Sequence, residues 1–155
     1  MPPDRTAASF AISALALDDM PSVKAIERAG QAFPWSDSMI AEELSCDHAY
    51  HFGARIDRNA PFSAFILCRM FCSELAIHNL CTDPEKRRRG LATALIRHVI
   101  AHARDRGARA AFLEVRPSND AAVALYSREG FSALNLRKKY YANGDDALTL
   151  TLSLI

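Results

Sequence analysis

The pattern of apolar and polar positions along the chain predicts a succession of strands and helices. Apolar residues at every second position from Tyr50 to Ile56 are typical of a half-buried strand. Phe62 to Met70 and Glu74 to Thr82 are apolar on both faces, which favours central strands of a sheet. The turn-forming residues Asp57 to Pro61 join the first two of these strands as a hairpin. In chain order the predicted elements are strand 10–17, helices 22–32 and 36–44, strands 50–56, 62–70 and 74–82, helix 90–106, strand 110–115, helix 120–129, and strands 131–140 and 147–154.

Local signals mark the ends of the predicted helices. Pro34 ends the first helix, and Ser36 is a good N-cap for the second. In the helix that begins at Gly90, apolar residues recur three and four positions apart, and Gly107 follows as the C-terminal cap. The expected buried positions are Val23, Ile26, Ala29 and Ala32 in the first helix, and Leu91, Ala94, Leu95, His98, Val99 and His102 in the third.

The order of these elements indicates an α/β protein with a mixed sheet and helices packed on it. Strands separated by a helix tend to lie parallel, so we expect parallel strands on either side of the helix that begins at Gly90. A chain of 155 residues is long enough to bury a core, and we expect a single domain over residues 1–155.

Charge and cysteine content exclude several classes of partner. The formal net charge is +1, so no overall field attracts DNA or a membrane surface, and neither is an expected partner. No apolar run approaches the ~18 residues that a membrane span needs. The four cysteines form no Cys-x-x-Cys pair and have no metal-ligand spacing with histidine. We therefore expect no metal, four buried thiols in a reducing, cytoplasmic setting, and a monomer.

The segment from Arg87 to Ala92 lies where a helix begins. The first backbone N–H groups of a helix have no partner inside it, and the helix dipole favours an anion there. Gly90 lacks a Cβ, so a phosphate can approach the main chain closely. These residues offer a cradle for a diphosphate, with Arg87, Arg88 and Arg89 around it. A solvated basic surface loop is the other interpretation that the spacing allows.

Three polar residues on later elements are candidates for chemistry. Glu114 is a charged residue inside an apolar strand, where it pairs with Arg116, lies at the exposed end of the strand, or faces a cleft as a general base. Tyr126 either packs its ring or gives a proton to a leaving group. Asn119 either caps the helix that follows it or contacts a ligand. The residue pattern leaves these alternatives open.

Four motifs together resemble the GNAT family of acetyl-CoA-dependent N-acetyltransferases. They are Thr82-Asp83-Pro84, Arg87-x-x-Gly90-x-Ala92, Leu113-Glu114-Val115-Arg116 followed by Ser118-Asn119, and Ala124-Leu125-Tyr126 followed by Gly130-Phe131. Segments 32–36 and 137–141 are similar to the RimI-type subgroup, which acetylates the N-terminal alanine of ribosomal proteins. The resemblance covers residues 20–152. It implies the GNAT fold, a mixed sheet of about six to seven strands with about four helices, splayed at the acetyl-CoA site.

The resemblance also implies roles for single residues. Glu114 matches the proton acceptor and Tyr126 the proton donor. A β-bulge at the strand end around residues 80–82 would splay the sheet there and open the acyl slot. The positions that match cofactor contacts are Leu80, Cys81, Thr82, Arg87, Arg88, Arg89, Gly90, Leu91, Ala92, Thr93 and Asn119. The positions that match parts flanking the acceptor peptide are Phe33, Pro34, Trp35, Ser36, Tyr140 and Tyr141.

The implied reaction is direct attack of an amine on the thioester of acetyl-CoA, without a covalent enzyme intermediate. An α-amine has a pKa near ~8 and is mostly protonated at neutral pH, so a base must first remove a proton. The expected acceptor is the N-terminal alanine of a ribosomal protein. A small-molecule amine, a lysine side chain and a non-catalytic acetyl-CoA-binding module are the alternatives.

Overall fold

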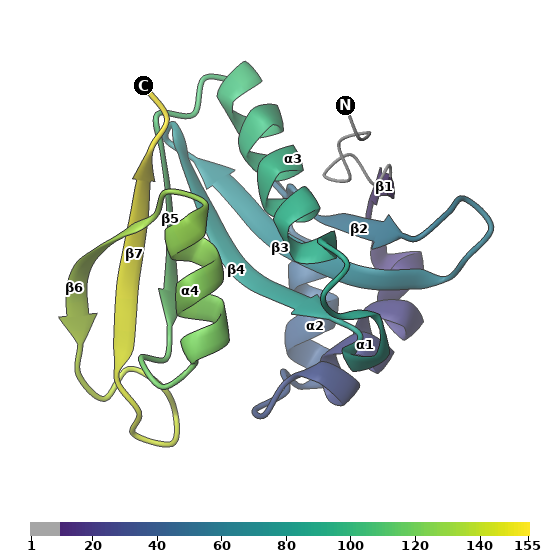
Figure 1. The fold of residues 1–155 in the computed structure, drawn as a ribbon, viewed down its shortest axis with the longest axis horizontal. Helices are drawn as coiled ribbons and strands as arrows, with labels where there is room; N and C mark the ends of the chain where they lie inside the picture. The colour runs from purple at the N-terminus through teal and green to yellow at the C-terminus, as the bar shows by residue number, and fades with distance from the viewer. Residues whose placement is uncertain (1–9) are drawn as a thin grey trace, which may run out of the picture.

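A seven-stranded sheet forms the centre of the protein, whose computed structural model describes residues 10–155 (Figure 1). The strands lie in the order β1-β2-β3-β4-β5-β7-β6. Each neighbouring pair is antiparallel except β4 and β5, which are parallel on either side of a helical connection, as predicted. The strand bounds are β1 (Ala11–Ala14), β2 (Phe52–Arg55), β3 (Phe62–Phe71), β4 (Glu74–Thr82), β5 (Ala110–Val115), β6 (Ser132–Arg137) and β7 (Ala147–Ser153).

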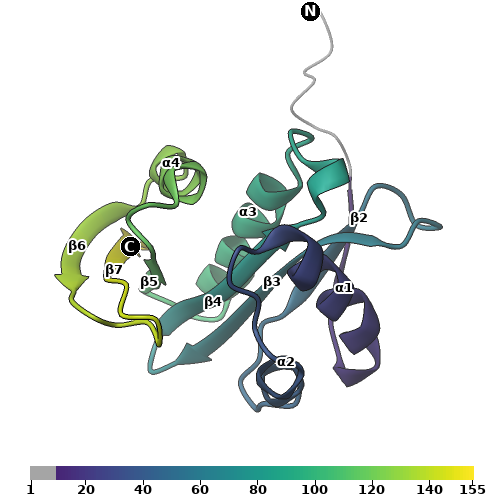
Figure 2. The same ribbon diagram turned by 90° about the horizontal axis from the view of Figure 1, so that it is seen from below.

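Helices cover both faces of the sheet, as Figure 2 shows. One face carries α1 (Met20–Gly30) and α2 (Asp37–Leu44), and the other carries α3 (Leu91–Asp105) and α4 (Asp120–Arg128). Short 3₁₀ turns, Leu17–Asp19 and Pro84–Lys86, precede α1 and α3. The mixed α/β architecture and the order of helices and strands are confirmed. The strands β1, β2 and β6 are shorter than predicted.

Two apolar clusters hold these layers together. The larger cluster lies between the sheet and the helices α3 and α4, and it includes Leu95, Leu113 and Leu150. The smaller cluster packs α1 and α2 on the opposite face, and it includes Val23 and Ile40. Burial of each such side chain contributes roughly 1.5–3 kcal/mol. The sheet is therefore anchored from both sides, and its strands are fixed relative to the helices.

The buried faces of α1 and α3 differ from the predicted stripes. Ala29 and Ala32 are exposed, whereas Glu27 has no exposed surface at all. In α3 the histidines His98 and His102 are half-buried and lie edge-on against the ring of Phe52. The predicted buried face of α3, which starts at Leu91, included too few rows of side chains. A helix that crosses a broad sheet buries more than one row. The buried positions of α3 are Leu91, Leu95, Ile96, Val99, Ile100 and Ala103.

A β-bulge interrupts the regular pairing of β4 with β3. Asn79 is opposite Leu67 and Ile77 is opposite Cys68, so His78 has no partner on β3. Beyond this point β4 diverges from β5, since their parallel pairing ends at Ile77 (Figure 1). The predicted bulge therefore exists, but it lies at His78, before the segment 80–82 in which it was expected.

The prediction of four buried cysteines is only half right. Cys68 and Cys81 are buried, Cys46 is intermediate, and Cys72 is exposed. Cys72 lies in the turn between β3 and β4 with a φ of 50°, so it is not on the strand face that the sequence suggested. Among residues 10–155, no helix is both long and apolar enough to cross a membrane.

Candidate active site

A cavity of about 900 Å³ opens where β4 and β5 diverge. Its walls come from the α1–α2 loop, the second half of β4, the loop before α3, the end of β5, and α4. Four of the predicted site residues, Pro34, Ser36, Arg89 and Tyr140, are not part of this lining. The predicted residues that do line it are Phe33, Trp35, Leu80, Cys81, Thr82, Arg87, Arg88, Gly90, Leu91, Ala92, Thr93, Glu114, Asn119, Tyr126 and Tyr141.

The start of α3 has the geometry of an anion cradle. Gly90 is the N-cap residue, with a φ of 86° and no side-chain cap on the helix. A Cβ at this position would have nothing within 4 Å, so the space above the backbone is open. The N–H groups of Leu91 to Thr93 lie in the first turn, where intrahelical partners are lacking. This combination favours binding of a phosphate group at the helix N-terminus.

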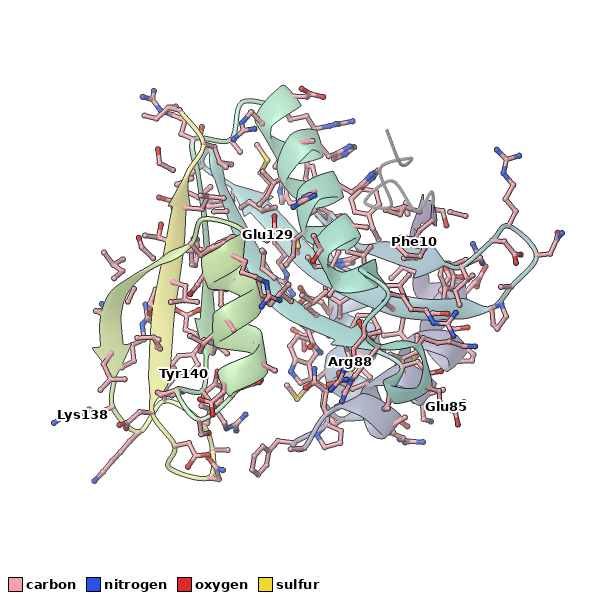
Figure 3. The ribbon with its side chains drawn as sticks, viewed as in Figure 1. Phe10, Glu85, Arg88, Glu129, Lys138 and Tyr140 are labelled. Atoms are coloured by element: carbon pink, nitrogen blue, oxygen red, sulfur yellow. The ribbon has the colours of Figure 1, made fainter. Side chains whose placement is uncertain are left out.

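The three arginines before α3 have different surroundings. Arg87 donates from its guanidinium to the carbonyl of Gly30 over 2.9 Å, which ties the loop to the C-terminal end of α1. Arg88 lines the cavity, on the side of the loop that faces α4 (Figure 3). Arg89 lies outside the lining. The expected ring of three arginines around a diphosphate is thus reduced to Arg88 and the partly engaged Arg87.

Glu114 lies on β5 with its side chain only 15% exposed. Its Oε1 is 3.6 Å from Nε of Arg137 and 3.5 Å from Oγ1 of Thr149, its cross-strand neighbour. The alternative pairing with Arg116 is wrong, because Arg116 donates to Asp145 instead. Glu114 therefore faces the cavity with a carboxylate that β6 and β7 hold in place.

Tyr126 projects from α4 into the same cavity. The residue is 5% exposed, and its ring packs edge-on against Phe131 at 5.4 Å between centroids. Burial raises the pKa of Tyr126 well above that of a free phenol, so the hydroxyl keeps its proton at neutral pH. Asn119 caps α4, accepting from the N–H of Ala122 through Oδ1, and it also contributes to the cavity wall.

Sequence reasoning missed a buried polar group beside these residues. Glu27 is fully buried and accepts from Nδ2 of Asn79, at 3.0 and 3.1 Å, and from the backbone N–H of Trp35 at 3.0 Å. Gln31 extends the network by donating to Oδ1 of Asn79 at 2.9 Å. Burial raises the pKa of Glu27, although these hydrogen bonds oppose the shift. The available signal was a glutamate beside Ile26 in the apolar stripe of α1.

The wall farthest from α3 is built around the guanidinium of Arg116. This group lies 4.2 Å from the ring centroid of Phe33 and 3.8 Å from that of Tyr141. Its Nε donates to Oδ2 of Asp145 over 3.0 Å. Tyr140 packs edge-on against Tyr141 and is 47% exposed, outside the cavity (Figure 3). Arg116 thereby links the α1–α2 loop to the β6–β7 loop through two cation–π contacts.

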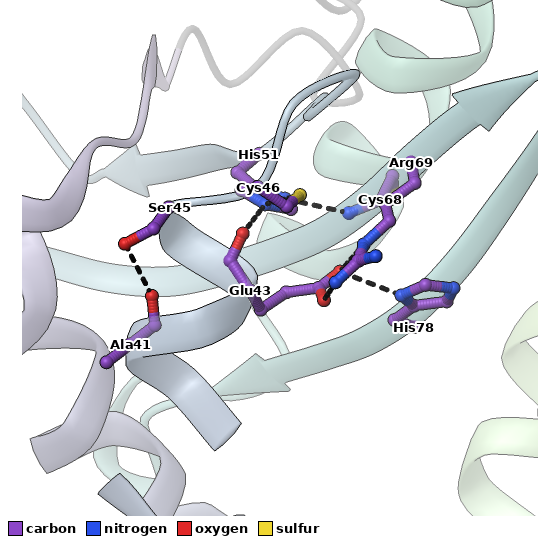
Figure 4. A network of polar contacts seen from close by, with 8 residues as sticks. All are labelled: Ala41, Glu43, Ser45, Cys46, His51, Cys68, Arg69 and His78. Carbon is purple, nitrogen blue, oxygen red and sulfur yellow. Dashed lines mark hydrogen bonds and ion pairs between the residues drawn. The ribbon is translucent and has the colours of Figure 1, made fainter. Parts of the chain in front are cut away.

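A second polar network lies between α2 and the sheet (Figure 4). The carboxylate of Glu43 accepts from Arg69 and from Nδ1 of His78. Burial by itself would raise the pKa of Glu43, but the hydrogen bonds from His78 and Arg69 outweigh it and lower the pKa to about 2. Glu43 is consequently ionised at neutral pH.

Glu43, Cys46 and His51 come close enough to resemble a metal-binding cluster, with ligand atoms within 4.8 Å of one another. Both ring nitrogens of His51 are engaged, however. Nδ1 accepts from the N–H of Cys68 at 3.0 Å, and Nε2 donates to the carbonyl of Glu43 at 2.7 Å. The Glu43 carboxylate is already neutralised by Arg69. A metal ion would have to displace these partners, so the donor set does not fit one.

Comparison with known proteins agrees with this geometry. The sequence model of the Acetyltransferase (GNAT) family matches residues 18–131. The chain is 34% identical to the ribosomal protein bS18-alanine N-acetyltransferase of Escherichia coli, over 92% of this chain and 97% of that one. It is 36% identical to the N-alpha-acetyltransferase RimI of Mycobacterium tuberculosis, over 76% of this chain and 74% of that one.

Solved structures share the fold. The crystal structure of the ribosomal-protein-S18-alanine N-acetyltransferase from Escherichia coli superimposes with a TM-score of 0.85 at 34% identity, covering 94% of both chains. Ard1 from Thermoplasma volcanium has a TM-score of 0.87 at 21% identity, which shows the fold alone. With the splayed sheet, the cradle at α3 and a family match over most of its length, the chain belongs to the GNAT family of acetyltransferases.

Proposed function

We propose that this acetyltransferase transfers the acetyl group of acetyl-CoA to the N-terminal amine of a protein, with the N-terminal alanine of a ribosomal protein as acceptor. One observation carries the proposal: a single cavity holds an open anion cradle, a carboxylate and a protonated phenol. The relatives from Escherichia coli and Mycobacterium tuberculosis are named for N-terminal acetylation, which supports the choice of acceptor. A single domain and a cytoplasmic location are part of the same proposal.

The residues at the start of α3 fit the diphosphate of acetyl-CoA. The backbone N–H groups of Leu91 to Thr93 receive it, with Arg88 nearby and Gly90 leaving room above the main chain. The free edge of β4 from Leu80 to Thr82, which β5 no longer pairs with, receives the pantetheine arm. Asn119 lines the opposite wall. When bound, acetyl-CoA supplies the thioester whose carbonyl carbon the amine attacks.

Glu114 and Tyr126 carry the proton transfers in this proposal. Glu114 accepts a proton from the acceptor amine, because the ammonium form has no lone pair for attack. Backbone N–H groups in the unpaired part of β4 polarise the thioester carbonyl as an oxyanion site does. Tyr126, kept protonated by its burial, gives its proton to the departing sulfur. Attack is direct, and no acyl-enzyme forms.

A small-molecule amine and a lysine side chain are the competing acceptors. The Arg116 contacts favour a peptide, because they join two aromatic loops into a wall alongside the reactive part of the cavity. A non-catalytic acetyl-CoA-binding module is disfavoured, because such a module needs neither Glu114 nor Tyr126 in its cavity.

Peptide acetylation followed by mass spectrometry tests the proposal. Peptides that begin with Ala, Ser or Met are incubated with acetyl-CoA and the protein, and the modified amine is located by fragmentation. A matched peptide with a blocked N-terminus and a free internal lysine serves as the control. Acetylation of the N-terminal amine, strongest with Ala, is expected. Modification of the lysine alone would overturn the N-terminal specificity.

A variant at Glu114 tests the assigned role. In Glu114→Gln we expect turnover to fall by about 10²-fold or more, in the range of general acid–base catalysis. Calorimetry should find acetyl-CoA binding unchanged, since Glu114 is not in the cradle. Glu42→Gln, an exposed position on α2, is the matched control and should keep wild-type turnover. Wild-type turnover of Glu114→Gln at every pH would remove Glu114 from the mechanism.

A further inference from the structure

The bulge in β4 places two neighbouring side chains on the same face of the sheet. Leu75 and Ile77, before the bulge, belong to the apolar cluster beneath α3, whereas Cys81, after it, belongs to the cluster beneath α1 and α2. The alternation of side chains between the two faces of the sheet is thus reversed at the unpaired residue, His78. His78 and Asn79 both point toward α1 and α2, where each meets a glutamate, Glu43 and Glu27 respectively.

The contact with Glu43 orients the imidazole of His78. Its Nδ1 is 2.7 Å from Oε1 of Glu43, a carboxylate that stays ionised at neutral pH and can only accept. Nδ1 therefore carries the hydrogen, and Nε2 of the neutral ring keeps a basic lone pair. In Figure 4 this second nitrogen lies on the side of the ring away from Glu43. The side chain of His78 is 36% exposed and lines the cavity that holds Glu114 and Tyr126.

Three side chains in this cavity are potential proton acceptors, and they differ in what already binds them. Both oxygens of Glu27 accept hydrogen bonds, and the residue has no exposed surface. One oxygen of Glu114 is shared between Arg137 and Thr149. Within residues 10–155, Nε2 of His78 has no hydrogen-bond partner. Among the same residues Oε2 of Glu114 has no partner either, but the side chain of His78 is the more exposed of the two, at 36% against 15%.

Acetyl transfer removes two protons from the acceptor nitrogen. An α-ammonium group has three protons, and the amide nitrogen of the product keeps one. One proton must leave before attack, to free the lone pair, and another must leave the nitrogen as the tetrahedral adduct collapses. Glu114 takes one of them in the proposed function.

We infer that His78, oriented by Glu43, is a catalytic base that accepts the other proton from the acceptor amine, either directly or through one water. This inference rests on the proposed function, since it assigns a further residue to the same reaction. The nitrogen forms its bond to the acetyl carbon, the carbon–sulfur bond breaks, and the sulfur takes the proton of Tyr126. Of the two protons lost by nitrogen, one restores the Tyr126 phenol. The other leaves to solvent from the half-exposed His78.

Charged groups from several elements surround His78. Glu43 on α2 contacts it directly, and Arg69 on β3 shares the same carboxylate. His51, on the segment before β2, binds the main-chain carbonyl of Glu43. On the β5 side of the cavity Glu114 is a titratable residue of the wall. The charges of Glu43 and Arg69 offset each other. The Glu43 carboxylate therefore orients the imidazole of His78 without adding a net charge beside it.

His78→Asn separates a catalytic role from a structural one. The amide nitrogen of Asn takes the place of Nδ1 and can still donate to Glu43, but the side chain has no basic nitrogen. We expect turnover to fall by about 10-fold to 10²-fold, with the KM for acetyl-CoA unchanged. His48→Asn is the matched control, because His48 is exposed and its φ of 62° suits asparagine. It should behave as the wild type.

The pH dependence of turnover gives a second test of the role of His78. The ratio of wild-type to His78→Asn turnover on one peptide cancels the ionisation of the amine itself. A neutral imidazole accepts a proton and an imidazolium does not, so the ratio should rise with increasing pH. A ratio that stays constant with pH, or wild-type turnover in His78→Asn, would overturn the inference.

Chemical rescue covers the case in which His78→Asn does not fold. In His78→Gly, free imidazole should restore turnover in a saturable manner, and absence of rescue in a folded variant counts against the inference. These results are distinguishable from failure of the proposed function. If the wild type acetylates no N-terminal peptide, the proposed function fails. The His78 comparison is then made on whichever amine the wild type does acetylate.

Discussion

The two sides of the cavity are built in different ways. The proposed cofactor side consists, apart from Asn119, of one continuous segment that runs from the end of β4 through the loop before α3 to the first turn of α3, and it offers mainly backbone groups. The acceptor side consists of side chains from distant segments. Gln31 and Asn79 are 48 positions apart, Glu43 and His78 are 35 apart, and Arg116 and Asp145 are 29 apart.

This difference has a physical basis. A helix N-terminus binds anions through groups that every helix possesses, so a short motif is enough to build it. A peptide-binding wall needs specific side chains, and their relative positions depend on how the sheet and its helices pack. Changes on the cofactor side should therefore alter the affinity for acetyl-CoA, and changes on the acceptor side should alter the response to the peptide. The following predictions test that separation.

The largest effect is expected at Tyr126, which lies between the two sides. Tyr126→Phe removes the hydroxyl and keeps the ring that packs on Phe131. We expect turnover to fall by about 10²- to 10⁴-fold while the KM values for acetyl-CoA and peptide stay near those of the wild type. Steady-state kinetics with both substrates varied measures this. A change confined to the KM for acetyl-CoA would place Tyr126 on the cofactor side instead.

Glu43 should make the stability of the acceptor side depend on pH. Its folded-state pKa of about 2 lies below the ordinary value of 4.5, so its ionised form stabilises the fold above pH 4.5. That contribution, on the order of 2 kcal/mol, is lost as the pH falls from 4.5 toward 2. Urea unfolding at successive pH values measures it. Glu43→Gln should lose this part of the pH dependence, and the adjacent exposed Glu42→Gln should keep it.

Gly90→Ala tests the anion cradle, and Gly107→Ala is the matched control. Gly90 and Gly107 have φ values of 86° and 88°, and a Cβ at either position would have nothing within 4 Å. Both substitutions should therefore cost a similar backbone strain of about 1 kcal/mol. Only Gly90→Ala places a methyl group where a phosphate would approach, so calorimetry should show roughly 10-fold weaker acetyl-CoA binding, or about 1.4 kcal/mol. Equal affinities of the two variants would count against the cradle.

Of these variants, Arg116→Lys should produce the smallest change, and it should alter the KM for the peptide only. Lysine keeps the charge but lacks the flat guanidinium that stacks between Phe33 and Tyr141. Loss of one cation–π sandwich is worth about 0.5–1 kcal/mol, so the KM for peptide should rise about two- to fivefold. Arg97→Lys, in an exposed ion pair with Glu129, is the control and should change neither KM. A change in the KM for acetyl-CoA would contradict the division between the two sides.

The candidate site shows where sequence reasoning succeeds and where it does not. The motif around Gly90 predicted where α3 begins, and Glu114 and Tyr126 do reach one cavity, because strand ends and helix starts fix their positions locally. Arg87 lines the same cavity, but its contact with α1 was not predicted. Nothing in its neighbourhood along the chain indicates that its guanidinium binds the carbonyl of Gly30, 57 positions away.

The sequence by itself determined the order of strands and helices, the parallel pair around α3 and the N-cap residue Ser36. These features follow from short-range periodicity and backbone geometry. Only the tertiary structure decided that Glu27 is buried, that His78 faces Glu43, and which cysteines are covered. For Glu27, His78 and Cys81 the reason is the bulge in β4, because one unpaired residue reverses the faces of the β4 residues after it. A bulge is defined by pairing with another strand, so no local pattern contains it.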